Sequence, residues 1–370
     1  MSVETVAAVR PISADSHICE PPNCFIDHIE AAWRDDAPRV VREDNHDRYV
    51  LKDFPAIPMP LVAAAGRDPR EVGIKFTTYD EMWRGGWDAK ARLADQDRDG
   101  VAAEMIYPTV GMALCHLEDR DYKQACMWAY NRWLQEEFIA VAPDRLFGIG
   151  LSAIRSVDEA IADFRRIKEM GFKGVMLPCH PSTAEDYEDP SFDPLWSVAE
   201  ELELPISFHI LTGKDAMPRG PKITRWNGVM RGVQDIISMF VFSGVFCRHP
   251  GLKLVCVEGD AGWLPHFAYR MDHAYNRHRF VDKCRELSRL PSELLFEHVY
   301  LTFQDDLIAF RVTDMLNPKR LMWANDFPHN DSTWPNSQAL LAKHTKDLAP
   351  QHKQAILHDN VRELYQLPVS

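Results

Sequence analysis

Four side chains that can bind a metal ion stand where predicted β-strands end. Asp15 and His17 end the first strand segment, His209 ends the fifth, and Asp326 follows the eighth. Residues i and i+2 of a strand point to the same side, so one cation could contact both Asp15 and His17. Imidazole nitrogens combined with carboxylate oxygens suit Zn2+, Mn2+ or Fe2+. The sequence therefore predicts one divalent cation held by these four residues, with His209 and Asp326 also serving in catalysis.

Each of these signals has a structural alternative. A single histidine at a strand end more often serves packing than metal binding, and Asp15-Ser16-His17 alone could form a turn. Asp326 could equally cap a helix. The coincidence of such residues at the ends of three separate strands favours the metal site, because those ends share one face of a barrel.

Further polar residues follow other predicted strands. Glu258, after the sixth strand, is a candidate catalytic carboxylate, and an ion pair with Arg270 is the alternative. His180, after the fourth strand, would bind substrate or metal, or face solvent. Together, Glu258 and His180 would form a second cation site. His329 and Glu20 are candidate substrate-binding residues.

Short apolar segments alternate along the chain with segments of helical spacing. The expected strands cover residues 11–17, 103–107, 146–153, 174–177, 205–210, 252–257, 299–302 and 320–324. The expected helices cover residues 87–100, 122–141, 157–170, 193–202, 230–247, 264–278, 306–316, 337–344 and 350–366. Nearly continuous apolar strands are typical of parallel sheets covered by helices. The pattern predicts an α/β fold, a (β/α)8 TIM barrel. An open doubly wound sheet is the alternative, but no Gly-x-Gly-x-x-Gly motif follows the first strand.

One stretch, residues 33–78, is rich in proline and charge and lacks the barrel periodicity. Within it, residues 39–51 have the alternation of a hairpin. We interpret residues 33–78 as an insertion after the first strand that forms a lid over the barrel mouth. Residues 1–370 would then form a single domain.

Composition narrows the class of partner. The net charge of −13 disfavours nucleic acid and anionic membranes, which select basic surfaces. No apolar run reaches the roughly 18 residues of a membrane span, and residues 1–11 lack the pattern of a signal peptide. The eight cysteines form no Cys-x-x-Cys pair, which is typical of reduced cysteines in a cytoplasmic protein. We therefore expect a cytoplasmic protein that acts on a small molecule.

The chain resembles, over almost its whole length, the amidohydrolase superfamily, in the branch of aminocarboxymuconate-semialdehyde decarboxylase and related aromatic-acid decarboxylases. The segments that carry the resemblance are residues 15–21, 92–95, 99–101, 107–109, 171–175, 208–209 and 323–329. The resemblance implies that Asp15-x-His17 is an acid variant of the family's first-strand His-x-His. It also implies that His209 is the fifth-strand ligand, and that Asp326 both binds metal and moves protons.

One position departs from the branch. Glu258-Gly259 stands on the sixth strand where the branch decarboxylases usually have His-Gly. The unusually apolar helix expected at residues 230–247 is either deeply buried or partly a dimer contact. The branch implies a homodimer.

Two reactions fit these residues. In the first, which we place slightly ahead, a metal-activated water hydrolyses an amide, lactone, ester or thioester of a small organic acid, and Asp326 transfers the proton. In the second, an aromatic or unsaturated acid is decarboxylated without oxidation, and Asp326 protonates the carbon that loses CO2. A non-catalytic metal protein is the third alternative, but structural metal sites are usually closed.

Overall fold

The central feature of the fold is one sheet of eight strands. The computed structural model describes residues 9–72, 74–75, 77–213 and 219–369. The sheet follows the order β1 (Ile12–His17), β5 (Ala103–Tyr107), β6 (Leu146–Leu151), β7 (Gly174–Met176), β8 (Ile206–His209), β9 (Leu254–Val257), β10 (Val299–Phe303), β11 (Leu321–Trp323). Every neighbouring pair is parallel.

Backbone hydrogen bonds join the two ends of this sheet. Asp326 N donates to Asp15 O at 3.1 Å, and His17 N donates to Phe327 O at 2.7 Å. The segment after β11 therefore lies beside β1, and the strands form a nearly closed barrel. This confirms the predicted (β/α)8 TIM barrel.

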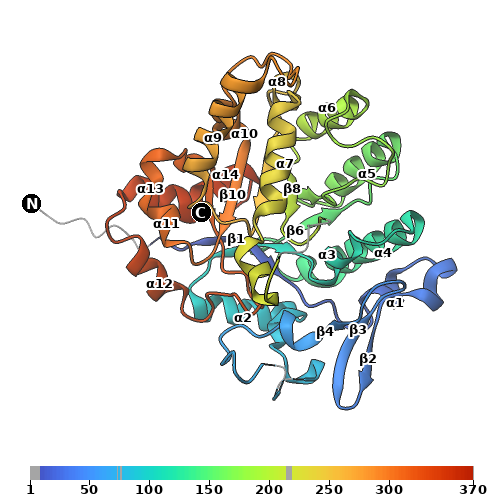
Figure 1. The fold of residues 1–370 in the computed structure, drawn as a ribbon. Helices are drawn as coiled ribbons and strands as arrows, with labels where there is room; N and C mark the ends of the chain where they lie inside the picture. The colour runs from blue at the N-terminus through green and yellow to red at the C-terminus, as the bar shows by residue number, and fades with distance from the viewer. Residues whose placement is uncertain (1–8, 73, 76, 214–218, 370) are drawn as a thin grey trace, which may run out of the picture.

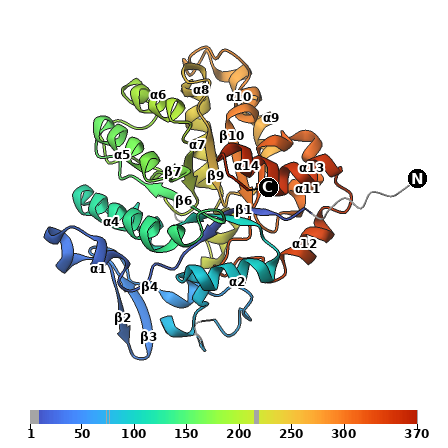
Figure 2. The same ribbon diagram turned by 180° about the vertical axis from the view of Figure 1, so that it is seen from behind.

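Helices surround the barrel in both views (Figure 1, Figure 2). They are α1 (Cys24–His28), α2 (Ala89–Asp99), α3 (Val110–Leu114), α4 (Arg120–Trp133), α5 (Val157–Glu169), α6 (Asp193–Glu201), α7 (Arg231–Phe242), α8 (Val245–Arg248), α9 (Leu264–His278), α10 (Pro291–His298), α11 (Leu307–Arg311), α12 (Ser337–His344), α13 (Pro350–Gln354) and α14 (Asn360–Leu364). Local sequence sets their ends. In α5, for example, Ser156 accepts a hydrogen bond from Glu159 N at the start, and Gly171 follows with φ +88°.

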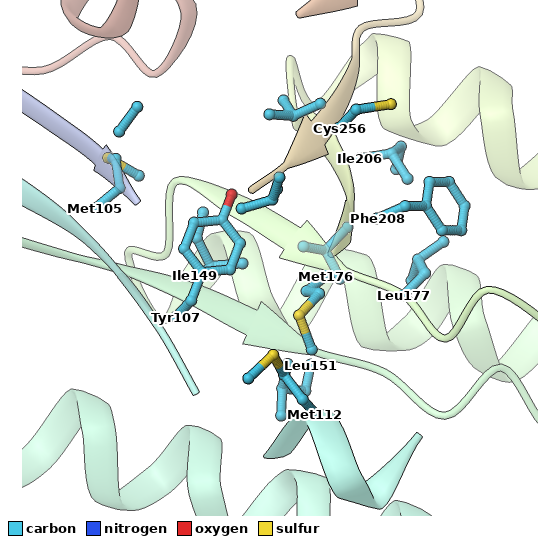
Figure 3. Packing of buried hydrophobic residues seen from close by; sticks show 14 of the residues in the cluster. Met105, Tyr107, Met112, Ile149, Leu151, Met176, Leu177, Ile206, Phe208 and Cys256 are labelled. Atoms are coloured by element: carbon cyan, nitrogen blue, oxygen red, sulfur yellow. The ribbon is translucent and has the colours of Figure 1, made fainter. Parts of the chain in front are cut away.

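Side-chain alternation along each strand separates core from site. On β8, Phe208 points outward and packs against Phe240 of α7, with ring centroids 5.8 Å apart. Ser207, one residue earlier, points into the barrel and forms a 3.0 Å hydrogen bond with the hydroxyl of Tyr107. Figure 3 shows the core that Tyr107 and Phe208 share with residues of neighbouring strands. His209 lies two residues beyond Ser207, so it also points inward.

The prediction of one continuous helix over residues 230–247 is wrong. The chain forms α7, which ends at Phe242, and then the short α8 from Val245. Gly244 separates them with φ +72°, a left-handed conformation that glycine adopts without steric cost. The apolar composition of the segment reflects burial, since Val233, Ile237 and Val241 are fully covered. Of the two roles considered for this segment, deep burial or partial contact with a second subunit, the structure supports burial, and the homodimer stays a prediction.

The predicted insertion contains a small sheet of its own. β2 (Arg39–Glu43), β3 (His46–Val50) and β4 (Ile57–Pro58) are antiparallel, and they lie beside α1 and α4 in both views (Figure 1, Figure 2). Further along the insertion, Ala65 N donates to Pro328 O at 3.0 Å. This segment therefore reaches the loop that follows β11, while a lid function stays a prediction.

Among the described residues, no helix has both the length and the apolar composition needed to cross a membrane. The prediction that residues 1–11 are not a signal peptide falls mostly on residues 1–8, which lie outside the described residues.

Candidate metal centre

The four predicted ligands meet at the carboxyl ends of the barrel strands. His17 Nε2 lies 3.2 Å from Asp15 Oδ1 and 3.5 Å from Asp326 Oδ1. His209 Nε2 lies 3.2 Å from His17 Nε2 and 3.8 Å from Asp15 Oδ2. All four side chains are fully buried. Strands far apart in the sequence thus bring two imidazoles and two carboxylates to one point.

Backbone carbonyls fix the orientation of both imidazole rings. His17 Nδ1 donates to Pro108 O at 2.8 Å, and His209 Nδ1 donates to Ile210 O at 2.9 Å. With the proton on Nδ1, each ring keeps a lone pair on Nε2, and the two Nε2 atoms face each other. Ligand histidines are commonly held by such bonds on the remote nitrogen. A cation bound between the two Nε2 atoms would be held by both lone pairs.

The surroundings of the Asp15 and Asp326 carboxylates also indicate whether these residues suit a metal ion. Within the described part of the chain, none of the four oxygens of Asp15 and Asp326 accepts a hydrogen bond of normal geometry, although all are buried. Buried carboxylates without donors are costly unless they are paired or bind a metal. The donor set of nitrogen and oxygen atoms suits a divalent cation such as Mn2+ or Zn2+. The residues present therefore fit one metal ion.

Two more residues complete the cluster. Glu258 Oε2 lies 3.5 Å from His209 Nε2. His329 stacks on His17 with ring centroids 3.9 Å apart, and its Nδ1 lies 3.0 Å from Asp326 Oδ1. Among the described residues, two overlapping groups have the spacing to hold an ion: Asp15, His17, His209 and Glu258; and His17, Glu258, Asp326 and His329.

Left-handed backbone turns aim two of these carboxylates into the site. Glu258, directly after β9, has φ +58°, and Asp326, three residues after β11, has φ +53°. Such conformations cost non-glycine residues on the order of 1–3 kcal/mol and occur preferentially at functional sites. Leu211, two residues after His209, is a third case with φ +64°.

The protonation states reflect crowded charge. Burial and the charge of Asp15 raise the pKa of Asp326 well above its ordinary value, and burial with the charge of Asp326 does the same for Glu258. Burial would also raise the pKa of Asp15, but His17 and His209 lower it below its ordinary range. Burial lowers the pKa of His17 to about 3. A cation would relieve the repulsion among the three carboxylates.

The second cation site at His180 and Glu258 stays a prediction. Glu258 belongs to the cluster just described, whereas His180 belongs to no comparable group of three or more ligands among the described residues. His180 is exposed and lines a separate cavity. Its predicted role in substrate binding stays untested.

Glu20 lies behind the centre, where its carboxylate holds the backbone. Its oxygens accept hydrogen bonds from Thr109 N, Val110 N and Gly111 N at 3.1, 2.9 and 3.0 Å. Thr109 Oγ1 in turn lies 2.9 Å from His329 Nε2. This geometry gives no support to direct substrate binding by Glu20, and it indicates a role in positioning the loop after β5.

Sequence reasoning missed the structural role of Arg92. This fully buried residue donates to Glu104 Oε2 at 2.6 Å, to His17 O at 2.9 Å and to Phe327 O at 3.1 Å. It therefore fixes the backbone at His17 and beside Asp326. No periodicity signals this role, because a helical arginine that faces inward has the same local pattern as an exposed one.

The cluster lies at the carboxyl ends of the strands, the face where barrel enzymes have their active sites. The family model described as Amidohydrolase matches residues 25–367. The chain therefore belongs to this family and is an enzyme of the amidohydrolase superfamily.

Several known proteins are similar to this chain in sequence or in fold. The chain is 24% identical over 304 residues to gamma-resorcylate decarboxylase of Rhodococcus jostii. The matched region covers 76% of this chain and 88% of that protein. An amidohydrolase structure from Mycobacterium avium subsp. paratuberculosis K-10 matches with a TM-score of 0.77 and 20% identity, covering 97% and 100% of the two chains. A dihydroxybenzoic acid decarboxylase from Polaromonas sp. JS666, with bound manganese and 2-nitroresorcinol, matches with a TM-score of 0.68, 16% identity and 98% coverage of each chain.

Proposed function

We propose that the protein is a metal-dependent, non-oxidative decarboxylase of an aromatic or unsaturated carboxylic acid. The observation that carries the proposal is the buried convergence of His17, His209 and Asp326 in a chain whose relatives include decarboxylases of hydroxylated aromatic acids. The comparisons thus favour the alternative we ranked second from the sequence over hydrolysis.

Asp15, His17, His209 and Asp326 would hold the cation. When bound, the cation supplies positive charge that can hold a substrate carboxylate and a neighbouring oxygen. Mn2+ is our first choice among Mn2+, Zn2+ and Fe2+, because the similar Polaromonas decarboxylase was crystallised with manganese.

Asp326 would be the proton donor. His329 Nδ1 lies 3.0 Å from Asp326 Oδ1 and would orient the carboxyl group for this transfer. The proton goes to the ring carbon that carries the substrate carboxylate. The bond between that carbon and the carboxylate then breaks, its electron pair restores the ring, and CO2 leaves. Asp326 regains its proton from water.

Glu258 favours hydrolysis as a second candidate function. The sixth-strand position carries a carboxylate that lies 3.5 Å from His209 Nε2, so the cluster holds three acids. A carboxylate at this place can act as a general base towards water. Hydrolysis of an ester, thioester, lactone or amide would use that base together with Asp326.

One experiment separates the two reactions. The Mn2+-loaded protein is incubated in H2(18)O with hydroxylated aromatic acids and, separately, with esters, thioesters and amides. We expect CO2 release from an aromatic acid, with no 18O in the organic product. Incorporation of 18O into the product of an ester, thioester or amide, with no CO2 from any acid, would overturn the proposal in favour of hydrolysis.

A further inference from the structure

A row of aromatic rings connects the long loop before α2 to the loop that carries Asp326. In both views the chain between β4 and α2 lies beside α2 (Figure 1, Figure 2), and we call its residues 63–67 and 82–86 the clamp. Trp83, in the clamp, meets Trp334 edge to face, with ring centroids 5.0 Å apart. Trp334 in turn contacts Phe327, with ring centroids 5.1 Å apart. Phe327 directly follows Asp326 in the chain, so the row of rings ends beside the metal centre.

Hydrogen bonds join the clamp to the same loop. Trp83 Nε1 donates to Ala65 O at 2.7 Å, and Ala65 N donates to Pro328 O at 3.0 Å. Ala65 therefore links the Trp83 side chain to the backbone of the loop after β11. The next residue, Gly66, has φ +64°, and a β-carbon at this position would lie 2.8 Å from Pro335 Cδ. The close approach of the two loops therefore requires glycine here.

The clamp also contacts the chain around His17. Cys19 N donates to Gly86 O at 2.7 Å. Arg92 donates through one nitrogen, Nη1, to Gly85 O at 3.0 Å and to His17 O at 2.9 Å. The clamp is therefore bonded to both loops that carry predicted ligands, the loop after β1 and the loop after β11.

The rings differ in their exposure to water. Phe327 and Trp334 are buried, whereas Trp83 is half-buried. Arg67 Cζ lies 4.7 Å from the centroid of the Trp83 ring, and Arg98 Cζ lies 4.7 Å from that of Trp334. Such cation–π contacts add to the attraction between the rings and their surroundings. Because Trp83 is the most exposed of the three rings, its replacement disturbs the contact with the least damage to the core.

We propose that Trp83 is a positioning residue for the metal centre, and that closure of the clamp is coupled to metal binding. The closed clamp would fix the backbone directly after Asp326 and thereby the place of its carboxylate. A clamp that favours the bound metal must itself be stabilised by the metal, because coupling between two events is reciprocal. The inference rests on metal binding alone, so it applies equally to decarboxylation and to hydrolysis.

Hydrogen exchange tests the coupling in the wild-type protein. Mass spectrometry compares exchange in peptides that cover residues 63–67, with and without saturating Mn2+. The amide of Ala65 can exchange only when its bond to Pro328 O opens. We therefore expect Mn2+ to slow exchange at least about fivefold, the lower end of typical coupling. Strand β2, at the edge of the small sheet, should exchange at the same rate in both conditions. Equal rates in residues 63–67 with and without Mn2+ would overturn the proposal.

Substitution of Trp83 tests the positioning role. Electron paramagnetic resonance should show that Mn2+ affinity falls at least about fivefold in Trp83→Leu, by the same reciprocity, and recovers in part in Trp83→Phe, which keeps a ring against Trp334. The slowing of exchange by Mn2+ should also disappear in Trp83→Leu. Trp33→Leu is the matched control, because Trp33 is likewise half-buried and its ring lies 5.7 Å from that of Tyr122. It should keep wild-type affinity.

The outcomes separate this inference from the proposed function. Wild-type Mn2+ affinity in folded Trp83→Leu, or an equal loss of affinity in Trp33→Leu, would overturn the positioning role and leave the proposed function standing. Absence of Mn2+ binding by the wild-type protein would refute both. If Trp83→Leu does not fold, Trp83→Phe and the exchange measurement on the wild-type protein still decide: wild-type affinity in Trp83→Phe together with unchanged exchange would refute the coupling.

Discussion

His17 and His209 face each other across 3.2 Å through their Nε2 atoms, while the Nδ1 atom of each ring contacts a backbone carbonyl. A cation bound between the rings would be held by both Nε2 atoms. The consequences can be measured in metal binding, in catalysis and in stability.

Mn2+ should stabilise the folded protein. A ligand at 100 times its dissociation constant adds about 2.7 kcal/mol to the free energy of unfolding, so thermal denaturation should shift upward with Mn2+ and return after chelation. The shift should disappear in His17→Gln. It should persist in His298→Gln, which alters a buried histidine bonded to Leu252 O outside the centre. An unchanged shift in His17→Gln would show that the ion binds elsewhere.

Asp326→Asn should slow turnover about 10²- to 10⁴-fold, the usual contribution of a general acid. The reason is that asparagine can still offer an oxygen to the metal but cannot deliver the proton. Steady-state kinetics should place the loss in kcat rather than KM, and metal analysis should confirm that the variant is loaded. The exposed Asp282 provides the control variant Asp282→Asn. Full activity of loaded Asp326→Asn would exclude both reactions considered above.

Arg92→Met should weaken both the fold and the metal site. Removal of one partner of a buried ion pair costs about 3–5 kcal/mol, and loss of the bond to His17 O should reduce Mn2+ affinity at least about tenfold. Arg92→Lys should recover part of each. Electron paramagnetic resonance on the folded fraction measures the affinity.

A control for Arg92 must lose stability elsewhere. Asp163→Asn serves this purpose, because Asp163 accepts hydrogen bonds from Gln124, Trp128 and Ser152 in a buried network. It should be less stable yet bind Mn2+ with wild-type affinity. Equal Mn2+ affinity in folded Arg92→Met and wild type would restrict Arg92 to a purely structural role.

Glu20 should make stability fall as pH rises. Burial raises its pKa from 4.5 to about 7, so the folded state binds a proton more tightly than the unfolded state. The resulting stabilisation is complete below pH 4.5 and is lost as the pH rises through about 7, a change of about 3 kcal/mol. Urea unfolding at several pH values measures the free energy of unfolding of wild type minus that of Glu20→Gln. This quantity should fall as the pH rises.

The comparison with Glu20→Gln isolates this group, because other titrating residues contribute to both proteins. The three backbone donors act in the opposite direction, since they favour the ionised carboxylate. If wild type instead gains stability relative to Glu20→Gln as the pH rises, the three backbone donors outweigh burial.

The sequence predicted the barrel and the four central residues because both follow from local patterns. Runs of apolar residues mark strands that are covered on both faces, and the i, i+2 spacing of Asp15 and His17 places them on one side. The helix break at Gly244 was missed because one glycine in a strongly apolar segment does not outweigh its helical spacing.

The sequence could not predict that Glu258 joins the central cluster while His180 does not. Both residues follow a predicted strand, but Glu258 enters the centre through a backbone with φ +58°, whereas His180 remains exposed. Local propensity disfavours such a conformation in glutamate. Tertiary contacts determine it, including the 2.8 Å bond from Glu258 N to Thr302 Oγ1.

The hydrogen bond from Asp326 N to Asp15 O can form only after nearly the whole chain has been synthesised. The first two ligands leave the ribosome about 15 to 60 seconds before the last one, at a synthesis rate of about 5–20 residues per second. Throughout that interval the seam of the barrel stays open and the cation has no complete set of donors. A metal ion could therefore bind to the complete site only near the end of synthesis and folding. A nascent chain stalled before residue 326 would have no catalytic activity.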